Sequence, residues 1–504
     1  MESSNGNKRK RPWMGWLLFS VAMVVVFFMG LLASSIMERR AEALFAYTPQ
    51  VELEEWEPRS EMWGENFPRQ YQSYLLTSDT MFASKHNSNR ADDLLARYPE
   101  FVVLWAGYAF SRDYNAGRGH YYAVEDVHNT LRTGAPMTPE DGPQPATCWT
   151  CKSPDVIRLM ERDGVAGFYS QTMAYYGPEV VNYIGCIDCH NGATMNLRIS
   201  RPALIEAYEN MGKDITKATH QEMRSLVCAQ CHVEYYFDQN KVEGANYLVF
   251  PWHKGLTAED MEAYFDEIGF ADWTHALSRA PMLKVQHPDY ELYKYGIHAQ
   301  RGVACADCHM PFRSEGGLKF SDHRMTSPLN NVANTCQVCH REEAANLIQT
   351  VYGMQDRILE IRRQLEKQLV RAHVEAKKAW NLGATEEQMH DVLQGIRQAQ
   401  WRWDFVAASH GAAFHAPLES ARIIGNGISI IQETRLQLAR ILASLGHNEP
   451  VPYPPIATKA EAQSYIGLDM DQLRQDKEVF LKTIVPKWIE EAVQREKGYR
   501  VTRL

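Results

Sequence analysis

Apolar residues recur at three- and four-residue steps through the last third of the chain. From about residue 359 they fall on one face of a helix, at Ile361, Leu365, Leu369, Ala372 and Ala376. Gly383 and Ala384 break this pattern, and Thr385 is placed to cap a second helix over residues 386–406. The pattern therefore predicts two consecutive long helices.

Two further helices are expected near the C-terminus. One runs from about Leu418 to Leu445 and ends at Gly446, and the proline-rich segment 449–455 then forms a non-helical connector. An amphipathic helix follows from Asp469. Residues 86–340 are instead rich in glycine, proline and aromatic residues, which predicts short helices and loops. We expect a mainly α protein with an irregular middle region and long helices over about 341–504.

The N-terminus has a different pattern. A basic cluster at residues 8–11 precedes an uncharged, mostly apolar run over about 13–36, and roughly 20 such residues suffice to cross a bilayer. We expect residues 1–44 to form a cytoplasmic basic stub, a transmembrane anchor and a linker. Residues 45–504 would then be one domain outside the cytoplasm. A cleaved signal is the alternative, because Ala41-Glu42-Ala43 resembles a cleavage motif.

Composition places the chain among ordinary globular proteins. Its 504 residues are 45% hydrophobic and 23% charged, enough for a large core. The formal net charge of −9 argues against a nucleic-acid binder, which would show a basic balance.

All ten cysteines occur in Cys-x-x-Cys pairs, and four of the five pairs are followed by histidine. The pairs are Cys148/Cys151, Cys186/Cys189, Cys228/Cys231, Cys305/Cys308 and Cys336/Cys339. Disulfides would not explain the fixed spacing. Zinc ribbons would leave one pair unmatched and the histidines unexplained, and thioredoxin-like chemistry has less support still.

Cys-x-x-Cys-His is the attachment motif of c-type haem. The thiols add to the porphyrin vinyl groups, and the adjacent histidine ligates the iron. The four expected proximal ligands are His190, His232, His309 and His340. Six-coordinate haems need a second ligand, and the histidines near attachment sites, glycine or proline are the candidates: His120, His298, His323 and His415.

The fifth pair, in CWTCKS, is followed by Lys152. A free lysine has a pKa near ~10.4, so holding the amine neutral at pH 7 costs about 4.6 kcal/mol, which the iron bond must offset. Burial beside a ferric centre lowers that cost. Either Lys152 ligates a fifth haem, or that haem takes its ligand from elsewhere in the chain.

The chain resembles the pentahaem, ammonia-forming cytochrome c nitrite reductases over about residues 101–488. The resemblance rests on LWAGYAFSRDYNAGRGHYYAVEDV, LRTGAP, CWTCKSPD, CHVEYYF, PMLKVQHPDY, QWRWDF and SHGAAFHAP. It implies a lysine-ligated active-site haem with an open face for nitrite, supplied with electrons by bis-histidine haems. It also implies active-site roles for Arg132, Tyr235 and His287 beside Lys152.

The same resemblance implies one calcium ion next to the active site. Its ligands would be the side chains of Glu234 and Gln286 and the backbone oxygens of Tyr235 and Lys284; oxygen ligands suit this hard cation. Other implied partners are a small multihaem quinol-oxidising electron donor and a second copy of the chain in a homodimer. The rival interpretations are a multihaem electron carrier without a substrate and a related sulfite- or hydroxylamine-converting enzyme.

Overall fold

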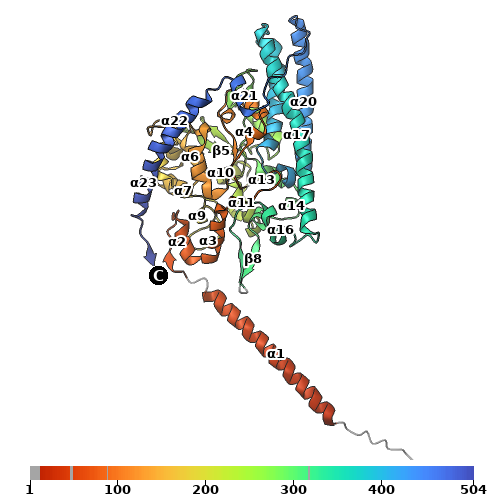
Figure 1. The fold of residues 1–504 in the computed structure, drawn as a ribbon. Coiled ribbons are helices and arrows are strands. Elements are labelled where there is room, and N and C mark those ends of the chain that lie inside the picture. Colours follow the sequence, from red (N-terminus) through yellow and green to blue (C-terminus); the bar gives the residue numbers. More distant parts are fainter. Residues whose placement is uncertain (1–11, 46–48, 88, 316–317) are drawn as a thin grey trace, which may run out of the picture.

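The computed structural model describes residues 12–45, 49–87, 89–315 and 318–504. Helix α1 (Pro12–Phe45) stands away from the rest of the protein (Figure 1). Its segment Trp13–Arg40 has a mean hydropathy of 2.5, long and apolar enough to cross a membrane by length and composition, and none of it is buried in the protein. The helix continues past residue 36 because good helix formers such as Glu38 and Arg39 follow. The basic cluster at residues 8–11 lies outside the described residues.

Three long helices pack together at the C-terminal side, as the apolar pattern predicts. They are α17 (Ala344–Asn381), α18 (Glu386–Ala407) and α20 (Pro417–Ser444), and Figure 1 shows α17 and α20 side by side. The Thr385 hydroxyl accepts a hydrogen bond from the Gln388 N–H, which confirms the predicted cap of α18. Helix α17 begins 15 residues before the predicted position 359. Gly353 and the buried Gln355 interrupt the apolar period there.

The predicted final helix is two helices, α22 (Met470–Thr483) and α23 (Val485–Glu496). Pro486 occupies the first turn of α23, where its missing N–H costs nothing, and this position ends α22. Residues 449–455 form no helix or strand, as predicted, and α21 (Lys459–Tyr465) follows them.

The middle of the chain is irregular, as expected, and consists of short helices joined by loops. The α-helices outside those already described are α2 (Ser60–Asn66), α3 (Pro68–Leu75), α4 (Leu94–Arg97), α5 (Glu100–Leu104), α6 (Ala123–Asn129), α7 (Asp155–Asp163), α8 (Val165–Tyr169), α9 (Cys186–Cys189), α10 (Pro202–Asn210), α11 (His220–Ala229), α12 (Ala258–Glu267), α13 (Asp289–Lys294), α14 (Ile297–Gln300), α15 (Cys305–His309), α16 (Val332–Thr335) and α19 (Ala412–His415).

Short antiparallel strand pairs, which the sequence pattern does not predict, fasten the loops. They are β1 (Val51–Glu52) with β10 (Thr502–Arg503), β2 (Asp92–Asp93) with β3 (Asn115–Ala116), β4 (Tyr236–Asp238) with β5 (Tyr247–Val249), β6 (Trp273–Thr274) with β7 (Pro281–Met282), and β8 (Phe312–Glu315) with β9 (Leu318–Ser321). The β1–β10 pair joins the two ends of the globular part.

The main apolar core lies between the loop-rich region and α17, α18 and α20. Trp401 and Trp403 on α18 are fully buried in it. The Trp401 indole N–H donates to the Ala258 carbonyl at 2.8 Å, and that of Trp403 donates to the Glu366 carboxylate at 3.0 Å. Each ring therefore supplies apolar area and also fixes α18 against a neighbouring helix.

Candidate active site in a cysteine-lined cavity

One cavity of about 2100 Å³ runs through the loop-rich region, and all ten cysteines lie along its wall. Their thiols form no disulfides. A pocket for one small molecule is typically about 300–1,000 Å³, so this cavity fits several large groups. The wall also contains every predicted site residue except Glu234 and Lys284, which lie behind it.

The cysteine motifs lie on helical turns, which places their two thiols on one side. Cys186 and Cys189 begin and end α9, and Cys305 and Cys308 lie on α15. Residues three apart in a helix are neighbours on its surface. This spacing gives each motif a pair of thiols facing the same part of the cavity, as covalent attachment of a porphyrin requires.

The eight predicted histidines form four pairs across the cavity. Ring centres are 5.9 Å apart for His120 and His232, 6.1 Å for His190 and His323, 6.2 Å for His298 and His340, and 6.3 Å for His309 and His415. Two imidazoles that bind one metal ion at about 2 Å from opposite sides have ring centres roughly 6 Å apart. The four pairs fit haems with two axial histidines.

Most of these imidazoles have their Nδ1 atom turned toward a protein group. Nδ1 of His190 is 2.9 Å from the Met195 carbonyl, and Nδ1 of His309 is 3.1 Å from that of Thr326. His323 is held in the same way by the Ser321 carbonyl at 2.8 Å. Such a partner fixes the tautomer and orientation of a metal-binding imidazole. Nε2 of these imidazoles is thereby left free to bind a metal ion.

The CWTCKS turn is held rigidly from outside the cavity. Trp149 is fully buried and its indole donates to the Met173 carbonyl at 2.9 Å. The Arg201 guanidinium donates to the carbonyls of Thr150 at 2.6 Å and Ser153 at 3.0 Å. Lys152 lines the cavity, and no hydrogen bond or ion pair of its ammonium is found within the described residues. Its amine is therefore available to a group bound in the cavity.

Arg132 lies on the same cavity, at the end of a loop fixed by Asp113. The Asp113 carboxylate accepts hydrogen bonds from the backbone N–H of Leu131 at 2.5 Å and of Arg132 at 3.1 Å. The Arg132 guanidinium lies over the Phe110 ring, 4.6 Å from its centre, and remains partly exposed. Gln144 connects this loop to the CWTCKS turn, because its amide contacts both the Arg132 carbonyl and the Cys148 thiol.

Tyr235 and His287 complete the expected trio along the cavity wall. Burial raises the pKa of Tyr235 well above its usual value, with the Cys151 and Cys148 thiols adding to the shift. Burial also lowers the pKa of His287 to about 3, and the nearby charges of His232, His410 and Lys152 act in the same direction. Asp289 opposes this shift. The structure thus brings a neutral phenol and an imidazole toward the region of Lys152.

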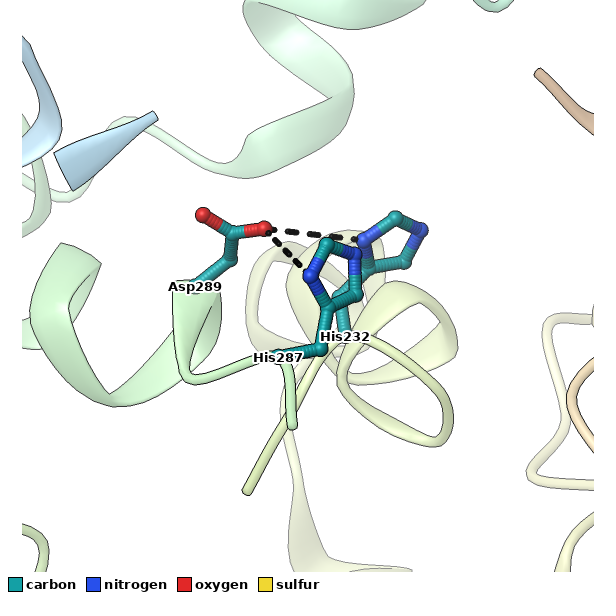
Figure 2. Close-up of side chains that lie close together, drawn as sticks. All are labelled: His232, His287 and Asp289. Carbon is teal, nitrogen blue, oxygen red and sulfur yellow. Dashed lines mark ion pairs between the residues drawn. The ribbon is translucent and has the colours of Figure 1, made fainter. Parts of the chain in front are cut away.

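Asp289, which the sequence analysis did not single out, lies between His287 and His232. Figure 2 shows all three side chains converging, with Asp289 Oδ2 3.4 Å from His287 Nδ1 and 3.9 Å from His232 Nδ1. Their ligand atoms are close enough to hold a metal ion. His232, however, belongs to a CxxCH motif and pairs with His120 across the cavity. Asp289 directly follows the VQHP segment, which contains His287. Its closeness to His287 in the sequence is the signal that could have identified it as a site residue.

The expected calcium ligands surround a cluster of buried acids. Glu234 is 1% exposed, its carboxylate accepts the Gln286 N–H at 2.6 Å, and burial raises its pKa well above the usual value. Burial also raises the pKa of Asp272 to about 7 and that of Glu291 to about 8. The Lys284 ammonium is paired instead with Asp404 at 2.9 Å. No ion pair of Glu234, Asp272 or Glu291 with a basic side chain is found within the described residues, which fits a bound cation at this place.

The comparisons with known proteins agree with this geometry. A sequence model described as Cytochrome c552 matches residues 59–497. Proteins named cytochrome c-552 are 59% identical in Parabacteroides distasonis, over 97% of this chain and 99% of the relative, and 45% identical in Aliarcobacter butzleri, over 95% of each.

A solved structure has the same fold. The catalytic subunit of cytochrome c nitrite reductase from Desulfovibrio desulfuricans, described with two calcium sites, superimposes with a TM-score of 0.73. It is 29% identical and covers 87% of this chain and 96% of its own. Fold and cavity together define a multihaem c-type cytochrome with long C-terminal helices. The chain belongs to the cytochrome c552 family, and it shares its fold with a cytochrome c nitrite reductase, an oxidoreductase.

Proposed function

We propose that this protein reduces nitrite to ammonium, with six electrons and eight protons per nitrite, at a haem attached to Cys148 and Cys151 and ligated by Lys152. The proposal rests on the Lys152 amine, in the one motif that lacks histidine, because this amine has no hydrogen-bond or ion-pair partner among the described residues. Arg132, Tyr235 and His287 line the same cavity. When bound, this haem supplies an open iron position and electrons. Two water molecules are the other product.

The surrounding side chains have complementary roles in the proposal. The Arg132 guanidinium attracts the nitrite anion and stabilises negative charge on its oxygens. His287, uncharged at neutral pH because burial lowers its pKa to about 3, takes up protons on its free ring nitrogen and passes them to the oxygens that leave as water. The neutral Tyr235 phenol, which lines the same cavity, donates a further hydrogen bond.

The four histidine pairs support four bis-histidine haems. In the proposed pairing, His190 and His323 serve the haem on Cys186/Cys189, and His232 and His120 the haem on Cys228/Cys231. His309 and His415 serve the haem on Cys305/Cys308, and His340 and His298 the haem on Cys336/Cys339. The support is the ring spacing of 5.9–6.3 Å in every pair. These haems would pass electrons to the Lys152 haem.

One calcium ion is proposed among Glu234, Gln286 and the backbone oxygens of Tyr235 and Lys284. The uncompensated acids support it, and the relative from Desulfovibrio desulfuricans is described with calcium sites. The Gln286 amide places Nε2 3.3 Å from the Lys284 carbonyl. It must turn its Oε1 toward a cation, a rotation that exchanges two nearly isosteric atoms.

The remaining expectations concern location and partners. An uncleaved α1 would hold the enzyme at the outer face of the cytoplasmic membrane, and the alternative is a soluble periplasmic protein with a cleaved signal. We propose a small multihaem quinol-oxidising cytochrome as electron donor and a homodimer as the assembled form. Their support is the membership of the chain in its family.

A spectroscopic titration with nitrite, with ammonium measured as product, tests the activity. A high-spin haem signal that shifts on adding nitrite supports the enzyme. Five low-spin haems that do not respond would instead support an electron carrier without a substrate. Sulfite and hydroxylamine titrations in parallel separate the related activities.

A Lys152→His variant tests whether the Lys152 amine is needed for nitrite reduction. The new residue completes an ordinary CxxCH motif, so haem attachment should persist. Nitrite turnover should fall at least tenfold because imidazole replaces the amine at the reacting haem. Haem content per chain and initial rates measure the two effects, and a turnover equal to wild type would contradict the role of Lys152.

A further inference from the structure

A single carboxylate faces three of the histidines that the proposed function uses. Asp289 Oδ2 approaches Nδ1 of His287 at 3.4 Å and Nδ1 of His232 at 3.9 Å, while Oδ1 lies 4.0 Å from Nδ1 of His415. The first is the proposed active-site histidine, and the other two are proposed ligands of different haems. All three imidazoles turn the same nitrogen toward Asp289 (Figure 2 shows the first two).

The carboxylate is itself held in place. Asp289 is the first residue of α13, and its Oδ1 accepts hydrogen bonds from the Ser409 hydroxyl and from the Gly411 N–H at 3.3 Å. Its side chain is only 14% exposed. These donors come from the turn between α18 and α19, so one carboxylate connects α13 to the turn that leads into α19, whose last residue is His415.

His415 supplies an independent sign of this role. Its Nδ1 is buried and has no hydrogen-bond partner within the described part of the chain. A buried donor without a hydrogen-bond partner is costly. The carboxylate that forms an ion pair with this imidazole is that of Asp289, at 4.0 Å. A small movement of the ring when its Nε2 binds iron would bring the N–H into hydrogen-bond distance.

We infer that Asp289 is a positioning residue shared by His287 and by the axial ligands His232 and His415, and that its negative charge lowers the reduction potentials of the two haems they serve. The inference rests on the proposed function. A carboxylate on the outer nitrogen of a ligand imidazole raises the basicity of that ligand. A nearby negative charge also favours the ferric over the ferrous haem, because the ferric form carries one more positive charge.

The same contact orients the active-site imidazole. With Nδ1–H directed at Asp289, His287 presents Nε2 to the cavity as one defined tautomer, as a carboxylate does for a catalytic histidine elsewhere. Asp289 thus links two haems that carry electrons with the group that moves protons. Asp289 stays ionised in this arrangement and takes up no proton.

The test is Asp289→Asn in the holoenzyme, which removes the charge but keeps the size of the side chain. A redox titration without nitrite, followed by the low-spin EPR signals, should show two haems shifted to higher potential and the others unchanged. Nitrite turnover should lose at least tenfold in kcat with little change in KM. Asp289→Glu restores the charge and should recover the potentials in large part.

The matched control is Glu342→Gln. Its carboxylate lies 3.9 Å from Nδ1 of another proposed proximal ligand, His340, but is 59% exposed, so water screens it. We expect no shift there. If Asp289→Asn does not load haem, Ser409→Ala tests the effect of the same charge and should shift the reduction potentials in the opposite direction. Without the hydrogen bond from the Ser409 hydroxyl, the negative charge of Asp289 acts more strongly on the imidazoles, and the reduction potentials of the same two haems should fall.

Two results would overturn the inference: unchanged potentials in Asp289→Asn, or an equal shift in Glu342→Gln. The redox titrations of both variants are done without nitrite, so the measured potentials are independent of the proposed activity. If wild-type protein formed no ammonium but the two potentials shifted, the proposed function would fail while the effect on the haems stood. Normal wild-type turnover with no shift in any variant would refute only the role of Asp289.

Discussion

Arg132 shows how a charged side chain can be kept available in a folded protein. Its backbone N–H is fixed by Asp113, while its guanidinium rests on Phe110 and is only 4.0 Å from one oxygen of that carboxylate. The contact holds the loop without closing a full two-pronged ion pair. The positive charge therefore remains directed at the cavity, where an anion can take up the unused N–H groups.

Arg132→Gln should weaken nitrite capture while leaving the fold intact. The loop keeps its backbone hydrogen bonds to Asp113, so haem content should not change. Loss of a charge-assisted contact to the anion is worth about 1.5–3 kcal/mol, which corresponds to roughly a 10- to 150-fold fall in kcat/KM. Steady-state kinetics measure it. Arg132→Lys should recover part of the loss, and unchanged kcat/KM in the glutamine variant would contradict the role.

Among the elements, α18 was the easiest to predict and α17 the most instructive. The Thr385 cap and the apolar period identify α18 from local sequence alone. The first four turns of α17 were missed because Leu347, Val351 and Met354 face the cavity rather than another helix. Their partners are groups that the sequence of amino acids does not contain, so a periodicity based on protein packing is weak there.

The residues of the candidate site likewise divide into those that the local sequence predicts and those that depend on contacts between distant segments. Cys-x-x-Cys-His motifs are local, and the sequence therefore predicts every attachment site and proximal histidine. Which distal histidine faces which motif depends on contacts far apart in the chain, such as His120 with His232 and His309 with His415. Asp289 was missed for the same reason, because two of its three histidine neighbours come from distant segments.

Helix α22 supports the Arg132 loop through one buried amine. The Lys477 ammonium donates to the His128 carbonyl at 3.0 Å and to the Thr133 hydroxyl at 3.3 Å. Burial lowers its pKa from 10.5 to about 8. Relative to the unfolded chain, the folded protein therefore favours the neutral amine, and below pH 8, where Lys477 is charged in both states, this costs about 3 kcal/mol of stability.

This shift gives a pH-dependent prediction for Lys477→Met. Between pH 8 and 10.5 the unfolded chain binds more protons at this position than the folded one, so wild-type stability rises with pH there. The variant lacks that contribution. The melting temperature of wild type minus that of the variant should therefore increase across this window.

Melting curves of both proteins at half-unit pH steps provide the measurement. Lys482→Met, on the exposed side of the same helix, is the control for removing one ammonium. A difference between wild type and Lys477→Met that stays constant from pH 8 to 10.5 would contradict the assignment.

At the scale of the whole molecule, the apolar N-terminal helix and the globular part are separate. Helix α1 is not buried against the rest of the protein, whereas β1 begins at Val51 and pairs with β10 near the C-terminus. The contacts that close the globular part thus begin after α1. Catalysis and membrane attachment should therefore be separable.

A chain that lacks residues 1–45, exported with a cleavable signal, should be soluble and active. It keeps β1, so the β1–β10 pair is retained. Membrane fractionation should recover the full-length protein with the membranes and the shortened one in the aqueous fraction. Haem content and nitrite turnover with an artificial electron donor should match within about twofold. A shortened protein that still sediments with membranes would show that another surface binds them.

The order of segments along the chain has a consequence for biosynthesis. All ten cysteines lie between residues 148 and 339, and α17, α18 and α20 come after the last of them. Because the segments after α1 are exported in their order along the chain, every attachment thiol is exposed before these helices emerge. Ligation machinery can therefore reach each motif while the cavity is still open. His415 emerges after α17 and α18 and just before α20, so the haem that it is proposed to ligate completes its coordination only as the three-helix layer closes over the loaded chain.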